Sequence, residues 1–377
     1  MGARNDGLRM KSIPDALRPP AASLPYQPQL DVIRTTAVCM VLWDHWCGHP
    51  AHPFGAIGVW LFFVLCGFLI TRILLNARAE EGAQAGSALA NFYARRFLRI
   101  FPLYYFVLLL SWGSSETFRA DWYWYVTYLQ NFHMMTTDDP VKVFGVHLWS
   151  LAVEEQFYVV WPLIALFAPR RALAPAIACA IALSIVLRGI LARMGWTDFQ
   201  IYVFTPDNFD TLGCGALLAY FWVHRRDKVV ALRRTAFAAG VLALAAMLLV
   251  RQPVLSAALM ATPTALIGLW FVARAAEGFR GVMGFAMSFP PSVYLGRISY
   301  GIYVYHFFAP AVLKPLFDRY HIRDGGVTFG LICFGVTVSV ASLSWFVLER
   351  PFLLLKPPFR SAGPSHGPAV LAGADRG

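Results

Sequence analysis

The segment LDVIRTTAVCMVLWDHW, residues 30–46, carries ionisable side chains at spacings that suit proton transfer beside an anion-binding group. Arg34 and His45 are eleven residues apart, so a helix would hold them within about 20° of one face and about 16 Å apart along it. Imidazole suits proton transfer near neutral pH, and guanidinium binds anions. A single histidine on an apolar helix is more often a core residue. The face shared with Arg34 and the adjacent Asp44 nevertheless favour catalysis by His45.

Two adjacent carboxylates, Glu154 and Glu155, lie in the apolar segment HLWSLAVEEQFYVVWPL, residues 147–163. On a helix, Glu155 points about 100° away from Glu154 and needs a different partner. Two interpretations are open. Both carboxylates could be locked to buried arginines that hold helices together, or Glu154 could tune an acid–base group or bind a cationic partner while Glu155 braces a neighbouring helix. Helical spacing favours the second, because it puts on the face of Glu154 a polar and aromatic stripe of His147, Ser150, Tyr158 and Trp161.

Three arginines, Arg95, Arg96 and Arg99, begin the apolar part of NFYARRFLRIFPLYY, residues 91–105. They could simply anchor the chain at the cytoplasmic surface, as Lys and Arg do beside membrane helices. They could also form an anion clamp, because guanidinium forks suit phosphates. A phosphate-rich cytoplasmic cofactor would be the natural ligand of such a clamp.

The composition indicates which elements must position these residues. Of 377 residues, 58% are hydrophobic and 14% charged, whereas soluble globular chains have about 25% charged residues. The sequence predicts an all-α integral membrane protein with about ten transmembrane helices in a single bundle. A charge at the centre of a membrane helix costs about 2.5 to 3.5 kcal/mol, so the ionisable residues are expected to face the bundle interior. The expected spans are 29–47, 57–75, 100–113, 147–167, 173–193, 210–223, 235–250, 256–273, 293–313 and 327–347.

The distribution of Lys and Arg predicts the orientation of the chain. With the N-terminus inside, most of them fall in the segments on the cytoplasmic side. Both termini are therefore expected in the cytoplasm, with residues 1–28 and 357–377 disordered on either side of one membrane domain, 29–356. The net charge of +11 then reflects topology and contact with anionic membrane lipids rather than binding of nucleic acid.

Two further features bear on possible ligands. Six cysteines are scattered singly without a C-x-x-C pair, which predicts free buried thiols, no disulfide framework and no metal site. The expected outer loop around Trp124 is dense in aromatic residues. These side chains could form an interfacial belt or a platform on which sugar rings stack.

Six motifs, taken in order, resemble the membrane-bound acyltransferase-3 family over about residues 29–356. Members of this family O-acylate surface polysaccharides, lipid-linked sugars, peptidoglycan or, in some cases, macrolides. The motifs are LDVIRTTAVCMVLWDHW, GVWLFFVLCGFLIT, FYARRFLRIFPLYY, HLWSLAVEEQFYVVWPL, GRISYGIYVYHF and WFVLERPF.

The resemblance implies a multi-pass O-acyltransferase of the bacterial inner membrane. It would move an acyl group, by default acetyl, from coenzyme A to a hydroxyl of a carbohydrate or glycosylated acceptor. The family's arginine and histidine of the first helix fall on Arg34 and His45, with His45 as the catalytic residue. The arginine-rich motif of the family falls on the contacts expected for coenzyme A, Arg95, Arg96 and Arg99.

The later motifs of the family also fall on definite positions. The glutamate-bearing motif falls on Glu154 and Glu155. Tyr303 and His306 lie in the late Ser-Tyr-x-x-Tyr-x-x-His segment, where packing in the bundle and a role in the site are equally open. No metal is implied.

Three positions depart from the pattern of the family. Trp60 stands where an acidic residue is frequent, Cys66 where serine is common, and Asn208 where arginine is usual, while Asp210 is kept. The missing acid and arginine could be a compensated charge pair or could mark an altered acceptor site. The candidate acceptor contacts are Glu155, Trp124 and Asp210.

Acyl transfer to a hydroxyl requires a positioned thioester and a base. With acetyl-CoA as donor, the arginines and Arg34 would hold the phosphates while the pantetheine arm runs along the first helix toward His45. His45 would act as a general base or carry the acyl group, oriented by Asp44 or Glu154. The rival interpretation is a proton-coupled membrane transporter that uses the same buried ionisable residues. The oligomeric state is left open.

The two carboxylates can be tested by replacing each separately. Glu154→Gln is expected to lower activity, because the stripe of Glu154 faces a polar cavity, while Glu155→Gln is expected to act more through helix packing. Activity and thermal unfolding of the purified variants are measured side by side. Two folded variants that retain full activity would remove both residues from the functional assignment.

Overall fold

Helices make up almost all of the described chain. The structure is a computed structural model that describes residues 26–48, 53–81, 85–137 and 143–355, and no strand occurs in these ranges. The all-α prediction is therefore confirmed. The end segments predicted to be disordered, 1–28 and 357–377, lie outside the described residues except for 26–28. The described residues from Gln27 onward belong to one compact unit.

The first half of the chain forms long helices joined by short ones. Their bounds are α1 Pro28–Cys47, α2 Phe54–Glu81, α3 Ala85–Ser114, α4 Glu116–Val126, α5 Gln130–Met135, the 3₁₀ turn η3 Val146–Leu148, α6 Trp149–Phe167 and α7 Arg170–Arg193.

The second half is more fragmented. Its elements are α8 Asp198–Val203, η4 Thr205–Asn208, α9 Phe209–His224, η5 Arg226–Lys228, α10 Val229–Val250, α11 Pro253–Leu259, α12 Thr262–Glu277, α13 Gly281–Ala286, α14 Pro290–Arg297, α15 Ser299–Tyr305, α16 Ala309–Arg319, α17 Val327–Ser344, the π-helical turn η6 Trp345–Glu349 and α18 Arg350–Leu354.

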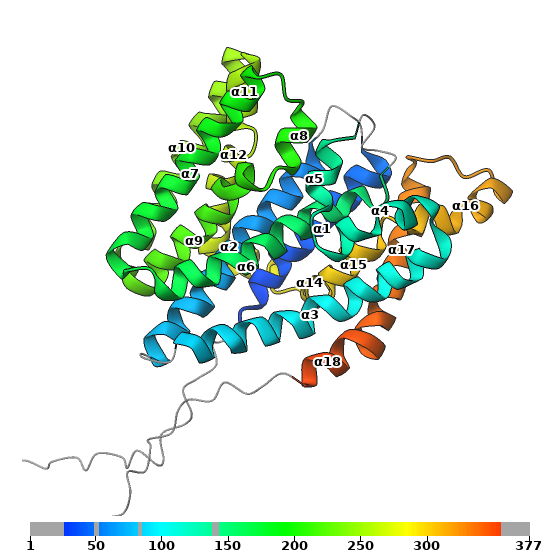
Figure 1. Cartoon of the computed structure of the whole chain (residues 1–377), viewed down its shortest axis with the longest axis horizontal. Helices are drawn as coiled ribbons and strands as arrows, with labels where there is room; N and C mark the ends of the chain where they lie inside the picture. The colour runs from blue at the N-terminus through cyan, green and yellow to red at the C-terminus, as the bar shows by residue number, and fades with distance from the viewer. Residues whose placement is uncertain (1–25, 49–52, 82–84, 138–142, 356–377) are drawn as a thin grey trace, which may run out of the picture. The chain divides into compact units, whose positions relative to one another are not determined.

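The helices α1 and α2 lie in the middle of the unit. Figure 1 shows α7, α9, α10 and α12 on one side of them and α15, α16 and α17 on the other, with α3 running across one end. The contacts agree, because α2 packs against α1, α9, α12, α6 and α3, and α1 also meets α14, α15 and α17. The motifs of the first two helices are thus placed where they can meet every later motif.

Seven helical stretches of the described chain are long and apolar enough to cross a membrane. The chain is therefore a multi-pass membrane protein, but the predicted count of about ten is not confirmed. The helix α1 falls outside the seven because its 20 residues include the charged residues Asp31, Arg34 and Asp44. The helix α9 falls outside because it has only 16 residues. The seven stretches are Phe54–Ala79, Ala85–Ser114, Val146–Phe167, Arg170–Arg193, Arg226–Val250, Pro253–Glu277 and Val327–Leu354.

The expected span 293–313 is not one helix. It is divided among α14, α15 and α16, with breaks at Ile298 and after Tyr305. The second break precedes Pro310, which has no backbone N–H to donate to the His306 carbonyl oxygen and so cannot continue the helix from α15. The consequence is a helix end at His306, in the interior of the unit, where backbone carbonyls need partners other than the next helical turn.

The closest helix crossing, between α2 and α9, depends on two glycines. A Cβ atom built on Gly67 would lie 2.0 Å from the Leu212 carbonyl oxygen, and one on Gly215 would lie 2.0 Å from the Val64 carbonyl oxygen. Each backbone therefore fills the space that a side chain of the other would need. Such close approach through small residues is typical of helix packing in membranes.

The glycine crossing predicts a specific loss of stability. Gly215→Ala is expected to lower the free energy of unfolding by about 1–3 kcal/mol, because the added methyl group forces α2 and α9 apart. Thermal unfolding in detergent is the measurement. Gly113→Ala on α3 is the matched control, since nothing lies within 4 Å of its added Cβ. Equal melting temperatures for the two variants would contradict the proposed packing.

Candidate functional site

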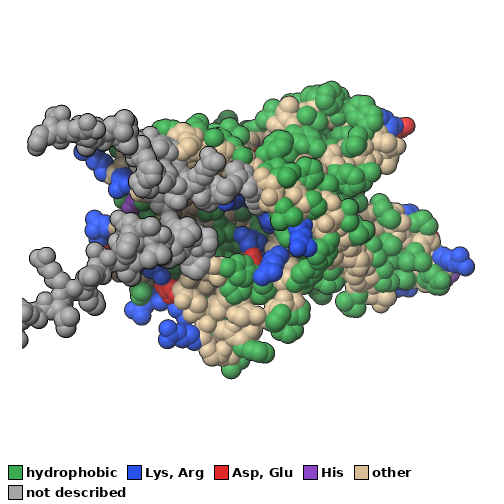
Figure 2. Space-filling view, turned by 90° about the horizontal axis from the view of Figure 1, so that it is seen from below, with side chains coloured by type: hydrophobic (Ala, Val, Ile, Leu, Met, Phe, Trp, Pro, Cys, Tyr) green, Lys and Arg blue, Asp and Glu red, His purple; other side chains and the backbone are tan. Residues whose placement is uncertain are grey.

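A cavity of about 100 Å³ lies among α1, α2, α3, α6 and α15. Its polar lining comes from segments far apart in the sequence, which meet here because each turns its charged face inward. Figure 2 looks at one face of the molecule, where Lys and Arg side chains gather near a hollow between the helices. The polar and aromatic lining residues include Arg34, Cys66, Arg96, Arg99, Ser150, Glu154, Glu155, Tyr158, Tyr300 and Tyr303.

Glu154 lies at the wall of this cavity and is held by neutral donors. Cys66 donates its S–H to Oε1 at 3.1 Å, and the Tyr158 hydroxyl donates to Oε2 at 3.2 Å. No ion pair joins Glu154 to an arginine among the described residues, which disagrees with the interpretation of a locked structural pair. The carboxylate therefore keeps a place on the cavity surface.

The predicted stripe on α6 is only partly present at the cavity. Ser150, Glu154 and Tyr158 line it together, as the helical spacing indicates. Trp161 instead donates its indole N–H to Thr71 Oγ1 at 2.7 Å, and His147 precedes the helix in η3. The stripe thus changes partners along its length.

Glu155 lines the same cavity despite the angular offset from Glu154. It also lines a second groove, together with Arg96 and Tyr158, on the flank where Phe97 of α3 and Val159 of α6 are exposed. Its Oε1 atom is buried and has no hydrogen-bond partner in the described part of the chain. A brace to a neighbouring helix through this atom is therefore not observed.

The four candidate arginines divide into two groups. Arg34, Arg96 and Arg99 line the cavity, whereas Arg95 does not. Arg34 forms an ion pair with Asp31 one turn earlier on α1. The guanidinium of Arg96 lies 4.6 Å from the centre of the Tyr158 ring. Within the described ranges Arg96 and Arg99 have no carboxylate partner, so the cavity presents cationic groups available to an anion.

His45 does not line this cavity. It is exposed at the far end of α1, and its Nδ1 atom lies 2.8 Å from Nε2 of His306. The two rings stack at 5.0 Å, and His147 approaches His306 edge-on at 4.9 Å. Asp44, predicted as a residue that orients His45, lies against Gly55 of α2 instead and makes no bond to His45 in the described structure. The side chain that holds His45 is His306.

Tyr303 connects the cavity to the histidines. Its hydroxyl lies on the cavity wall, 2.5 Å from Ser150 Oγ, and donates to the His147 carbonyl oxygen at 2.8 Å. Its own carbonyl oxygen lies 2.6 Å from Nδ1 of His306. Tyr303 therefore lines the cavity and also contacts His306, the partner of His45. The spacing of Tyr303 and His306, three residues on one helical turn, was the only sequence signal for this connection.

The histidine cluster was compared with the geometry of metal sites. No group of three or more His, Cys, Asp or Glu side chains in the described ranges has a geometry that could hold a metal ion. All six cysteines are free. Two of them, Cys214 and Cys333, are buried, whereas Cys179 is exposed and so departs from the prediction of buried thiols.

Trp124 lies on α4, away from the cavity lining. Its ring stacks on His133 at 5.3 Å with an angle of 11° between the planes, and His133 pairs with Asp121 at 3.2 Å. Its neighbours Trp122 and Tyr123 are exposed. The half-buried, stacked ring leaves the belt and the sugar platform both open as interpretations.

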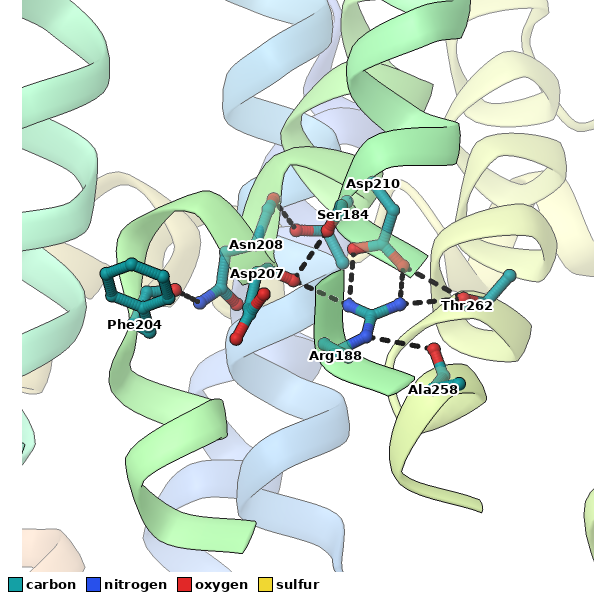
Figure 3. Close-up of polar contacts among 9 residues, drawn as sticks. Ser184, Arg188, Phe204, Asp207, Asn208, Asp210, Ala258 and Thr262 are labelled. Atoms are coloured by element: carbon teal, nitrogen blue, oxygen red, sulfur yellow. Dashed lines mark hydrogen bonds and ion pairs between the residues drawn. The ribbon is translucent and has the colours of Figure 1, made fainter. Parts of the chain in front are cut away.

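Asp210 is held in a buried ion pair that sequence reasoning missed. Figure 3 shows Arg188 of α7 meeting the carboxylate with two parallel hydrogen bonds, at 3.0 and 2.6 Å, and Thr262 adding a third at 3.0 Å. Arg188 also donates to the carbonyl oxygens of Asp207 and Ala258. The available signal was Arg188 inside the apolar span 173–193, since such a charge needs a partner.

The carboxylate of Asp207, three residues before Asp210, has no such ion pair in the described structure. The Asp207 side chain is buried without a hydrogen-bond partner in the described structure, and its backbone oxygen serves Arg188 instead. Burial raises the pKa of Asp207 to about 7, against the opposing effect of the nearby Arg188.

Two of the departures from the family pattern occur at one place. Trp60 packs edge-on against Tyr202 at 5.5 Å, and Asn208 donates to the Tyr202 carbonyl oxygen at 3.0 Å. Positions 60 and 208 thus both contact Tyr202, and the compensated pair and the altered acceptor site both stay open as interpretations.

Comparison with known proteins identifies the family of the chain. A family model described as an acyltransferase domain matches residues 27–347. The chain therefore belongs to the acyltransferase-3 family, which confirms the resemblance seen in the motifs.

The curated relatives are longer proteins. YrhL of Bacillus subtilis, provisionally named a peptidoglycan O-acetyltransferase, is 29% identical over 363 residues, covering 86% of this chain and 55% of the relative. The peptidoglycan O-acetyltransferase OatA of Listeria monocytogenes is 27% identical over 358 residues, covering 86% and 56%. The chain thus spans just over half the length of these relatives. No solved structure matches it.

The buried ion pair predicts that Asp210 matters first for stability. Asp210→Asn is expected to cost about 3–5 kcal/mol of unfolding free energy, because it leaves the buried Arg188 charge without its counter-charge. Thermal unfolding and acceptor affinity are measured together.

The matched control is Asp318→Asn, in the Lys314 pair whose side chains are 70% and 65% exposed. Its expected cost is at most about 1 kcal/mol. An Asp210→Asn protein of unchanged stability and weakened acceptor binding would instead favour direct contact between Asp210 and the acceptor.

Proposed function

We propose that this chain transfers an acetyl group from acetyl-CoA to a hydroxyl of a carbohydrate acceptor, of the peptidoglycan type named for its relatives. One observation carries the proposal: a cavity with arginines from two helices ends at Tyr303, the residue that also holds the histidine bound to His45. A donor site and a base are thereby brought together in one unit. The membrane is the bacterial inner membrane, with both termini in the cytoplasm.

The cationic end of the cavity suits the phosphates of coenzyme A. Arg96 and Arg99 carry no carboxylate partner in the described chain, and Arg34 keeps one donor face beyond its Asp31 pair. Guanidinium groups bind phosphate oxygens through paired hydrogen bonds. Arg95, one turn before Arg99 on α3, does not line the cavity, and in this proposal it only adds positive charge to the same helix.

The chemistry proceeds at the other end of α1. His45 Nε2 takes the proton of the acceptor hydroxyl while that oxygen attacks the thioester carbonyl carbon. The bond from that carbon to the coenzyme A sulfur then breaks, and the proton passes from His45 to the leaving thiolate. Because the cavity ends at Ser150 and Tyr303, the contact between these two side chains must open for the thioester to reach His45.

Glu154 acts within the donor cavity, far along the helices from His45. Its carboxylate, held by Cys66 and Tyr158, balances the charge of Arg96 and Arg99 and orders the cavity wall. In this proposal the group that orients His45 is therefore not Glu154, and the loss of Glu154 is felt mainly as weaker donor binding.

The test is acetyl transfer by the purified protein in nanodiscs with acetyl-CoA and a peptidoglycan fragment. His45→Ala is expected to lower kcat by about 100-fold or more, the usual contribution of a general base. Arg99→Gln is expected to raise KM for acetyl-CoA by about 10-fold, because it removes a phosphate contact.

Arg119→Gln is the control for the loss of a positive charge, since Arg119 lies on α4 outside the cavity lining. Equal activity of His45→Ala and wild type would remove His45 from catalysis. If neither the wild type nor any folded variant binds or turns over the thioester, the proton-coupled transporter becomes the better assignment.

A further inference from the structure

We infer that His306 is a positioning residue that fixes the tautomer of His45 and leaves Nε2 of His45 free of a proton. The inference deepens the proposed function and rests on it for its catalytic meaning. The inference rests on three groups in contact: the Tyr303 carbonyl, the His306 ring and the His45 ring.

The chain starts at the end of α15. This helix ends at Tyr305, and no backbone N–H beyond that end donates to the Tyr303 carbonyl oxygen in the described chain. The Tyr303 carbonyl oxygen lies 2.6 Å from Nδ1 of His306, and a carbonyl can only accept a hydrogen bond. The proton of this bond must therefore be on Nδ1 of His306.

The neutral state of His306 follows from its surroundings. The side chain is completely buried, and no carboxylate pairs with it in the described chain. A buried, unpaired imidazolium would be costly, so the ring carries one proton only. With that proton on Nδ1, the Nε2 atom has a lone pair and acts as an acceptor.

The same reasoning passes to His45. Its Nδ1 atom lies 2.8 Å from the accepting Nε2 of His306, so Nδ1 of His45 must be the donor. A neutral His45 then has its lone pair on Nε2, on an exposed ring that an acceptor hydroxyl can approach. An unrestrained imidazole exchanges between two tautomers, and only this one presents a base at Nε2.

The third histidine of the cluster does not compete for this role. Nε2 of His147 lies 3.3 Å from the Val304 carbonyl oxygen, so its proton is on Nε2, and its Nδ1 atom has no partner in the described structure. Its ring packs against His306 and Phe307 without a hydrogen bond to His45. The Tyr303 carbonyl thus determines which ring nitrogen carries the proton, first in His306 and then in His45.

The hydrogen bond between His45 and His306 also orients His45 after proton transfer. When Nε2 of His45 takes the hydroxyl proton, the imidazolium keeps its Nδ1–H bond to the neutral His306. The ring therefore holds its orientation while the proton is returned to the leaving thiolate. No proton has to move through His306, which distinguishes a positioning role from a shuttle.

Two variants separate tautomer control from packing. The amide oxygen of His306→Gln can reach the position of Nε2 and accept from His45, whereas the shorter side chain of His306→Asn reaches only the position of Nδ1. Both remove the ring and so lose similar packing. We expect His306→Asn to lower kcat by about 10- to 100-fold with KM for acetyl-CoA within about 2-fold of wild type, and His306→Gln to restore most of kcat.

The tautomer itself is measured by ¹⁵N solid-state NMR of histidine-labelled wild-type protein in nanodiscs, with the His45 signals assigned by their loss in His45→Ala. The expected spectrum has a protonated Nδ1 and an unprotonated Nε2 for His45. A protonated Nε2 on neutral His45, or equal kcat for the Asn and Gln variants, would overturn the inference. This readout does not need activity, so a wild-type protein without acetyl transfer would overturn the proposed function while the tautomer is still decided.

Discussion

The cost of a charge in hydrocarbon is the constraint on which this structure depends. The chain places Asp, Glu, His and Arg within apolar helices, and each must be turned inward and given a partner. Arg188 and Asp210 meet this need by neutralising each other completely, and Glu154 meets it with a thiol and a phenol. Arg96 and Arg99 are different, because they face a cavity rather than a carboxylate. No carboxylate forms an ion pair with either guanidinium in the described chain, although Glu154 and Glu155 line the same cavity, and this is why we propose an anionic ligand there.

Local patterns made much of this arrangement predictable. The spacing of Arg34 and His45 on one helix and the common face of Ser150, Glu154 and Tyr158 depend only on helical geometry, and the structure has both. The division of 293–313 into three helices could not be read from its hydrophobicity, because an apolar run looks the same whether or not the backbone is broken. The count of about ten spans is not confirmed, partly for that reason.

Contacts between distant segments were beyond prediction. His45 and His306 are 261 positions apart, and Arg188 and Asp210 lie on different helices, so no periodicity relates the members of either pair. Adjacency in sequence did not show where the Asp44 side chain lies, which is against Gly55 of α2. Only packing, through the glycines at the crossing of α2 and α9 and the short helix α15, decides which of these side chains meet.

Cys66 gives the donor cavity a property of practical use. Its thiol lines the cavity where related sequences commonly carry serine, while Cys179 is exposed on α7. A small thiol-selective label will therefore find one site that a bound ligand shields and another that it does not. The ratio of the two labelling rates reports cavity occupancy without an engineered cysteine, with Cys179 as the internal standard. In this chain Cys66, in place of the common serine, therefore reports whether the cavity is occupied.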